Sequence, residues 1–195
     1  MIDRLKHGAA VLVAAGAVLG LSAGIGSAAS GEGEIVVAQA ETAPPSSLPG
    51  GASSLQETYQ DWQVACVQQN TGSRCIMRQQ QVDQQSRQQV LAVELMVAAE
   101  KVDGVMVLPF GLDLDKGVVL QVDEGEADPA LRFRTCLPAG CVVQVSFDDA
   151  RIAALRKATA LKIKVVADGG NETPLTVSLK GFSAALDRVA ELSKK

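Results

Sequence analysis

Residues 131–147 read LRFRTCLPAGCVVQVSF, and this stretch indicates how most of the chain folds. Apolar and polar side chains alternate on both sides of a short segment that contains a proline and a glycine. A period of two is typical of a strand with one buried face, and Pro and Gly favour a tight turn. The stretch therefore predicts a β-hairpin, with Cys136 and Cys141 on either side of its turn.

The same alternation recurs through the second half of the chain and in two segments before it. One buried face and one solvated face are typical of strands in antiparallel sheets. We therefore predict a mainly β fold, either an antiparallel sandwich or a partly open barrel. The residues predicted to share buried faces are Trp62, Val64 and Cys66; Leu91, Val93, Leu95 and Val97; Leu131, Phe133 and Thr135; Cys141, Val143, Val145 and Phe147; Leu161, Ile163 and Val165; and Leu175, Val177 and Leu179.

Two segments depart from the period of two and predict short helices, the second at the C-terminus. In residues 147–158, Asp148 or Asp149 is placed to cap the first helix. In residues 182–195, Ser183 is the predicted cap, and the final lysines suit a helix C-terminus. The glutamine-rich segment between residues 78 and 89 is interpreted as a solvated hairpin end.

The N-terminal residues carry the features of an export signal. Arg4 and Lys6 precede residues 8–31, which contain no charge and end in small residues. This pattern predicts a signal peptide over residues 1–29, with an alternative cleavage after residue 40. An uncleaved membrane anchor is the rival interpretation. Both place the body of the chain outside the cytoplasm, and we expect a periplasmic, secreted or cell-surface protein.

A linker and one domain are predicted to follow. Residues 30–56 are rich in Ala, Ser, Pro, Gly and Glu, a composition that buries too little apolar surface to fold. Residues 57–195 are long enough for a single β-rich domain.

The charge of the chain excludes two classes of partner. The net charge is −4, and removal of Asp3, Arg4 and Lys6 with the signal makes it −5. Nucleic-acid binding and polybasic membrane binding both need clustered Lys and Arg. We therefore expect neither.

The four cysteines decide which chemistry remains open. Their spacings are eight residues between Cys66 and Cys75 and four between Cys136 and Cys141. Neither spacing suits a zinc knuckle or a C-x-x-C redox pair, and the only histidine, His7, leaves with the signal. Four cysteines allow three pairings, of which the local one is simplest. We predict disulfides Cys66–Cys75 and Cys136–Cys141, which staple two hairpins.

Two acidic segments remain as candidates for metal binding or catalysis. Asp113 and Asp115 resemble the opening of a calcium loop, but Lys116 and Gly117 follow where further oxygen ligands are needed. The second segment is a run of acids in a glycine-containing turn, typical of a solvated loop. The acids of this second segment are Asp123, Glu124, Glu126 and Asp128. We predict no metal, no cofactor and no catalytic residue.

Five motifs, taken in order, resemble the invasion-associated locus B family of exported bacterial proteins. They are DWQVAC (61–66), the second cysteine Cys75, LPFGLDLDKGVVLQVD (108–123), LRFRTCLPAGC (131–141) and VSLKGFSAAL (177–186). The resemblance covers nearly all of the chain after the predicted linker. It implies an envelope protein, some pathogenic relatives of which are linked to host-cell entry. It implies no established catalytic residues.

Three functions are consistent with these observations. The leading hypothesis is a non-catalytic binding module for an envelope or host protein or glycan, linked to host-cell interaction or envelope integrity. The second is a structural or stress-related envelope protein without a specific ligand. The third is a carboxylate-based glycan hydrolase, which would need two acids converging in one pocket.

Overall fold

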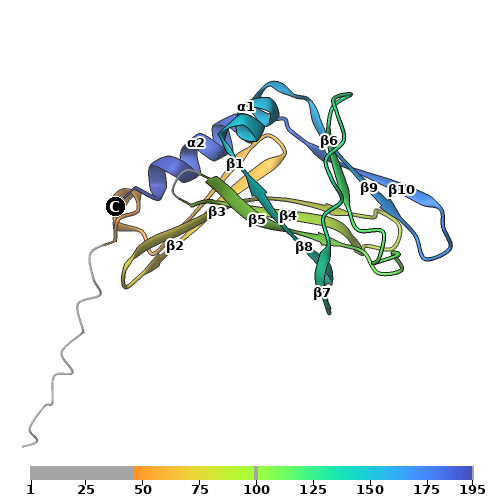
Figure 1. Ribbon diagram of the computed structural model, residues 1–195. Coiled ribbons are helices and arrows are strands. Elements are labelled where there is room, and N and C mark those ends of the chain that lie inside the picture. The colour runs from red at the N-terminus through yellow and green to blue at the C-terminus, as the bar shows by residue number, and fades with distance from the viewer. Residues whose placement is uncertain (1–45, 99–100, 195) are drawn as a thin grey trace, which may run out of the picture. The chain divides into compact units, whose positions relative to one another are not determined.

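Two antiparallel sheets, two α-helices and a short 3-10 helix (Pro49–Gly51) make up residues 46–98 and 101–194, the part of the chain that the computed structural model describes (Figure 1). The larger sheet has seven strands, in the order β1-β2-β3-β4-β5-β8-β7, and the smaller has three, in the order β10-β9-β6. The strands of the larger sheet are β1 (Ser54–Tyr59), β2 (Trp62–Gln69), β3 (Gly72–Val82), β4 (Gln89–Ala98), β5 (Lys101–Leu108), β8 (Gly140–Phe147) and β7 (Phe133–Leu137). Those of the smaller sheet are β10 (Glu172–Ser178), β9 (Ala160–Val166) and β6 (Val119–Val122).

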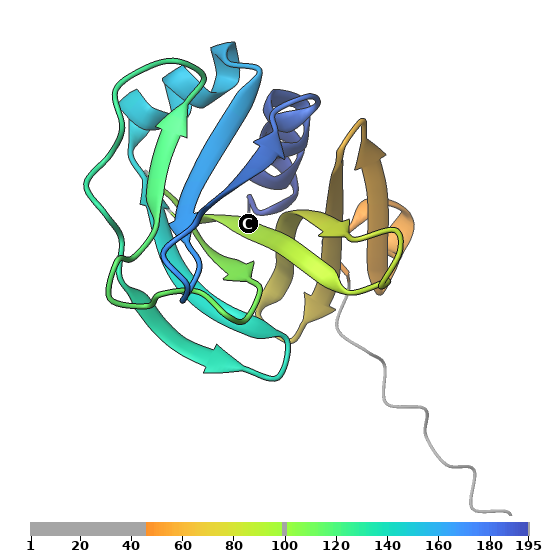
Figure 2. The same ribbon diagram turned by 90° about the vertical axis from the view of Figure 1, so that its right-hand side faces the viewer.

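The sheets are not closed into a barrel, because β1 and β7 stand at opposite ends of the larger one (Figure 2). The arrangement fits a sandwich and confirms the predicted fold class. Helix α1 (Asp149–Lys157) follows β8, and helix α2 (Phe182–Leu192) packs against β1 to β4. The Trp62 ring on β2 meets the Phe182 ring at the start of α2 edge to face, with centroids 5.5 Å apart.

Alternation along the strands predicts most of the core correctly. The apolar residues named for β2, β8 and β9 are all buried, as are the first three named for β4. The prediction that Thr135 on β7 is buried is wrong, because this residue is exposed. The pairing of β7 with β8 shifts register between Phe133 and Thr135, so that Arg134 is the extra residue of a bulge. The bulge breaks the alternation that the sequence predicts.

The two helices differ in how well their starts could be predicted. Asp148 caps α1 as expected, and its side chain accepts a hydrogen bond from the Arg151 N–H. Ser183 does not cap α2. The helix begins at Phe182, and Gly181 occupies the N-cap position. Gly181 has a φ of 83°, and a Cβ there would lie 2.0 Å from the Tyr59 carbonyl oxygen. The close approach to β1 sets the start of this helix, and a local cap pattern does not.

Glutamine side chains join the two sheets. Gln79 on β3 is 7% exposed, donates to the Ser178 carbonyl oxygen at 2.9 Å and accepts from the Ser178 N–H at 3.0 Å. Gln81 donates to the Thr176 carbonyl oxygen at 2.7 Å. The interpretation of this segment as a solvated hairpin end is therefore wrong for Gln79 and Gln81, which bind the edge of β10.

The domain begins earlier than predicted. The linker was expected to continue to residue 56, but Leu48 is 3% exposed within the core and β1 begins at Ser54. Gln68 on β2 accepts hydrogen bonds from the Ser47 N–H and the Ser46 hydroxyl, both at 3.1 Å. These contacts tie the segment before β1 to the sheet. The predicted signal peptide and the linker up to residue 45 lie outside the described residues.

Candidate functional site

Each predicted disulfide pair is joined in the structure, and both bonds connect residues that face each other on neighbouring strands. Cys66 on β2 pairs with Cys75 on β3, and Cys136 on β7 pairs with Cys141 on β8. The Cα–Cα distances are 4.1 and 3.9 Å, as expected for the closer, non-hydrogen-bonded type of antiparallel pair. The described part of the chain has no free cysteine, which leaves no thiol there for catalysis.

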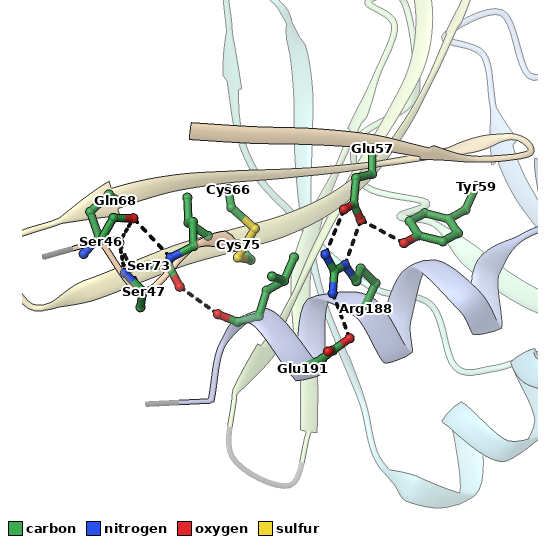
Figure 3. Close-up of a disulfide and its surroundings, with 12 residues drawn as sticks. Ser46, Ser47, Glu57, Tyr59, Cys66, Gln68, Ser73, Cys75, Arg188 and Glu191 are labelled. Atoms are coloured by element: carbon green, nitrogen blue, oxygen red, sulfur yellow. Dashed lines mark hydrogen bonds and ion pairs between the residues drawn. A yellow bond between two sulfur atoms is a disulfide. The ribbon is translucent and has the colours of Figure 1, made fainter. Parts of the chain in front are cut away.

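The Cys66–Cys75 end is covered by α2 (Figure 3). Ser73 donates a hydrogen bond from its hydroxyl to the Leu192 carbonyl oxygen, 2.7 Å away at the end of the helix. Both cysteines are buried. This disulfide is therefore part of the core beneath α2.

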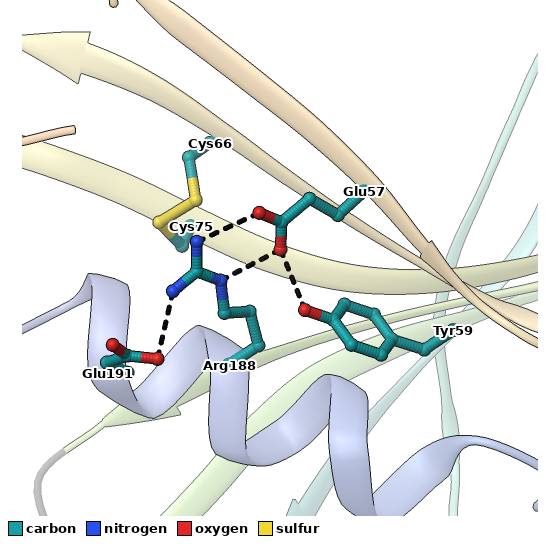
Figure 4. A network of polar contacts seen from close by, with 6 residues as sticks. All are labelled: Glu57, Tyr59, Cys66, Cys75, Arg188 and Glu191. Carbon is teal, nitrogen blue, oxygen red and sulfur yellow. Dashed lines mark hydrogen bonds and ion pairs between the residues drawn. A yellow bond between two sulfur atoms is a disulfide. The ribbon is translucent and has the colours of Figure 1, made fainter. Parts of the chain in front are cut away.

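A polar network beside this disulfide holds α2 against β1 (Figure 4). Arg188 on α2 donates to both carboxylate oxygens of Glu57, at 2.8 and 2.9 Å, and to Glu191 at 2.9 Å. The hydrogen bonds from Arg188 lower the pKa of Glu57. Burial raises the pKa of Tyr59, and so does the hydrogen bond that its hydroxyl donates to Glu57. Each of the four side chains, Glu57, Tyr59, Arg188 and Glu191, is bonded to at least one other of the network, which is typical of a structural contact.

The β7–β8 end presents apolar side chains to solvent. Phe110 is 60% exposed and lines an open hollow together with Pro109, Pro138 and Ala139. Leu137, which precedes Pro138 in the hairpin turn, is 54% exposed. We call these five apolar residues the hairpin-tip surface, and Gln88 and Gln89 line the same hollow beside them. Grouped exposed apolar side chains are typical of interaction sites, whereas single ones are common on any protein.

The backbone beneath the hairpin-tip surface is closely packed. Gly140 has a φ of 137°, and a Cβ at this position would lie 2.3 Å from the Leu108 carbonyl oxygen. Only glycine allows the hairpin to approach the end of β5 so closely. The disulfide Cys136–Cys141 closes the same turn. The exposed side chains therefore stand on a fixed backbone.

The predicted acidic candidates do not converge. Asp123 accepts hydrogen bonds from the N–H groups of Thr159 and Ala160, and the Glu124 carboxylate pairs with Lys162. Asp113 accepts a hydrogen bond from the Asp115 N–H at 3.1 Å. Within residues 46–98 and 101–194, no three acidic, cysteine or histidine side chains are grouped as metal ligands would be.

Asp128 lies in the hollow between α1 and the end of β8, together with Asp148. Asp128 forms an ion pair with Arg151, and Asp148 caps α1 through the Arg151 N–H. Both carboxylates are therefore engaged in holding α1.

Comparisons with known proteins identify the family. The family model described as Invasion associated locus B (IalB) protein matches residues 62–190. Two Brucella abortus proteins named invasion protein B homolog are 51% identical to this chain over 150 residues, 76% of this chain and 86% of each relative. The chain belongs to the IalB family.

Further IalB relatives support the assignment. Invasion protein B of Bartonella bacilliformis is 41% identical over 151 residues, which cover 75% of this chain and 81% of that protein. The crystal structure of invasion associated protein b from Bartonella henselae aligns with a TM-score of 0.65 at 39% identity, covering 71% of this chain and 96% of that one. The resemblance inferred from the motifs is thereby confirmed.

The IalB match spans the hairpin-tip surface, but the sequence alone did not identify it. The motifs LPFG and CLPAG both place a large apolar residue next to proline in a turn, where polar residues are usual. This departure from the usual composition of turns is a signal in the sequence for an exposed apolar surface. Only the fold shows that the two turns, which are more than 20 residues apart in sequence, lie at the same end of β5 and β8.

No helix among the described residues is long and apolar enough to cross a membrane. The two disulfides fit a protein exported to an oxidising compartment.

Proposed function

We propose that this IalB family member is a non-catalytic binding module of the bacterial envelope that docks a partner protein on its hairpin-tip surface. The observation that carries the proposal is the exposure of Phe110 and Leu137, by 60% and 54%, on two turns that lie together. Covering exposed apolar groups with a partner lowers the free energy of the system, because apolar surface is removed from water. We favour a partner protein over a glycan, because the two most exposed side chains, Phe110 and Leu137, are large and apolar, and the only hydrogen-bonding side chains in the lining of the hollow are those of Gln88 and Gln89.

The rigidity of the turn favours binding. A surface that is already ordered loses little conformational entropy when a partner docks. The Cys136–Cys141 disulfide and the close contact at Gly140 both order the hairpin before any partner arrives. The hairpin-tip surface is therefore better prepared for binding than a loop of the same composition.

The acidic side chains support a non-catalytic role. Asp123, Glu124, Asp128 and Asp148 all bond to nearby backbone or basic groups that hold the fold. The N-terminal signal pattern and the disulfides support a periplasmic or surface location. In this location the module would contribute to envelope integrity or, in organisms that have hosts, to contact with host cells.

Affinity capture from envelope fractions and culture medium, followed by mass spectrometry, tests this function. The baits are the exported chain, the double variant Phe110→Ser/Leu137→Ser, and the control Val67→Ser. Val67 on β2 is 50% exposed and lies outside the hairpin-tip surface. We expect one reproducible partner with the exported chain and the control, and a loss of about 30-fold in affinity with the double variant, as for interface residues of high energy.

Two outcomes would count against the proposal. The first is that no partner recurs, which favours the structural envelope role. The second is that a partner binds the double variant as well as the exported chain, which places the interface elsewhere. Circular dichroism and urea unfolding of all three proteins establish that lost binding is not lost folding.

A further inference from the structure

A second hollow lies beside the hairpin-tip surface, along the edge of β7. Residues 114–117 form one wall and residues 130–135 form the other. Strand β7 is the last strand of the larger sheet, so one of its edges has no neighbouring strand. The bridge between Val118 and Leu131 closes one end of this space, and we call the open part the β7 groove.

The β7 groove gathers positive charge in a chain that is acidic as a whole. Lys116, Arg132 and Arg134 line it and are exposed, and none forms an ion pair with another described residue. Asp115 is the single acid in its lining. The net charge of the chain is −4, so this local excess of cations runs against the average. A ligand with carboxylates is therefore complementary to the groove.

The cations alternate with apolar groups. Arg132 and Arg134 are exposed on either side of Phe133, which packs partly against the core. On the opposite wall, Leu114 is 46% exposed. Arg132 and Arg134 are two positions apart and both are exposed, and the bulge at Arg134 interrupts the regular alternation between them. In an extended peptide, side chains two positions apart lie on one face, where a carboxylate can meet each arginine. The groove thus matches an extended segment in which acidic and apolar residues alternate.

The geometry points to an extended, acidic segment of the partner protein, which binds in the β7 groove and adds to the free edge of β7. This inference rests on the proposed function, because it describes the same partner and an adjoining surface. Strand addition uses backbone hydrogen bonds for affinity and side-chain contacts for specificity. The guanidinium groups of Arg132 and Arg134 would select carboxylates, and Leu114 would contact an apolar side chain.

The same features have a protective interpretation. Charged residues and bulges on edge strands prevent unwanted pairing with other sheets. If this were the only role of Arg132, Arg134 and the bulge, neutral replacements would cause self-association and would leave recognition of acidic peptides unaffected. The two interpretations therefore predict different behaviour of one variant.

Selection from a random library of ten-residue peptides displayed on phage tests the inference. The targets are the exported chain, Arg132→Gln/Arg134→Gln, and the control Arg74→Gln/Lys164→Gln. Arg74 and Lys164 are exposed strand residues that also form no ion pair with described residues, and they lie outside the groove. We expect enriched peptides with acidic residues two positions apart, and binding that weakens about tenfold or more in the groove variant but not in the control.

A selected peptide is then synthesised with N-methyl groups on alternate backbone nitrogens. Methylation of the nitrogens that face β7 should abolish binding, because it removes the donors that pair with the strand edge. Methylation of the other set should have little effect. If both methylated peptides bind like the parent, the segment does not add to β7.

Three further results would overturn the inference. They are the absence of enriched peptides, enrichment of peptides without acidic residues, and self-association of the groove variant with unchanged peptide binding. Partner capture that depends on Phe110 and Leu137 but not on Arg132 and Arg134 would leave the proposed function standing and remove only this inference. Loss of dependence on Phe110 and Leu137 would instead remove the proposed function.

Discussion

The β2–β3 hairpin and the β7–β8 hairpin carry the same covalent device in opposite surroundings. In each, a disulfide joins two directly paired residues of neighbouring antiparallel strands. Cys66 and Cys75 are 1% and 4% exposed under α2, whereas Cys141 is 3% exposed but its partner Cys136 is exposed. The first disulfide therefore lies wholly within the core, whereas the second joins a buried residue of β8 to an exposed residue of β7.

Loop length alone would make the two disulfides nearly equal. In the chain-entropy model, closing loops of about ten and about six residues contributes roughly 2.7 and 2.2 kcal/mol. The surroundings separate them further, because the loss of a buried bond also leaves a cavity in a packed core. If burial separates the two disulfides, removal of each should lower the free energy of unfolding by a different amount.

The largest expected effect is that of Cys66→Ala/Cys75→Ala. We expect the free energy of unfolding to fall by about 3–5 kcal/mol, because loss of the cross-link is combined with loss of packing beneath α2. Urea denaturation followed by circular dichroism measures this change. Peptide mapping of the unreduced wild type should first show Cys66 linked to Cys75, and a crossed pairing would invalidate the comparison.

The matched change at the other hairpin is Cys136→Ala/Cys141→Ala, for which we expect a loss of about 1–2 kcal/mol. The exposed turn can unfold locally without opening the core, so only part of the entropic contribution of the cross-link adds to the free energy of global unfolding. Binding of the captured partner should weaken more clearly than stability, because the hairpin-tip surface is no longer ordered in advance. Equal losses of stability in the two double variants would show that burial does not separate the disulfides.

Both hairpins could be predicted from sequence because their signals are local. Alternation over a few residues defines the strands, and cysteines on either side of a short turn define the staples. The same holds for α1, whose cap at Asp148 is the residue next to the helix. Local chemistry was sufficient for these elements, but it did not reveal the bulge at Arg134 within the β7–β8 hairpin.

Contacts between distant segments could not be predicted in this way. Gln79 is buried because it meets Ser178, which is 99 positions later in the chain, and α2 starts where Gly181 approaches Tyr59. The hairpin-tip surface likewise depends on Phe110 and Pro138 coming together. Nothing in the neighbouring sequence of Gln79 distinguishes it from the solvated glutamines of the same segment.

The smallest expected effect concerns the network that holds α2 beside the buried disulfide. Arg188 lowers the pKa of Glu57 below its usual value near 4.5, so the folded state binds the Glu57 proton less tightly than the unfolded state does. The resulting stabilisation is fully present above the unfolded pKa and is lost as the pH falls through the folded pKa. Because Glu57 and Arg188 are partly exposed, we expect Glu57→Gln to cost only about 0.5–1 kcal/mol at pH 7.

This cost should disappear when urea unfolding is repeated at a pH below the folded pKa of Glu57, where the wild-type carboxyl is also protonated. Asp187→Asn is the control, since Asp187 lies on the same helix and pairs with Arg156 but is 68% exposed. We expect a smaller change for this control at either pH. If Glu57→Gln costs the same at both pH values, the network contributes through packing and not through charge. The end of the molecule that carries the buried disulfide would then be held by α2 and its apolar face alone.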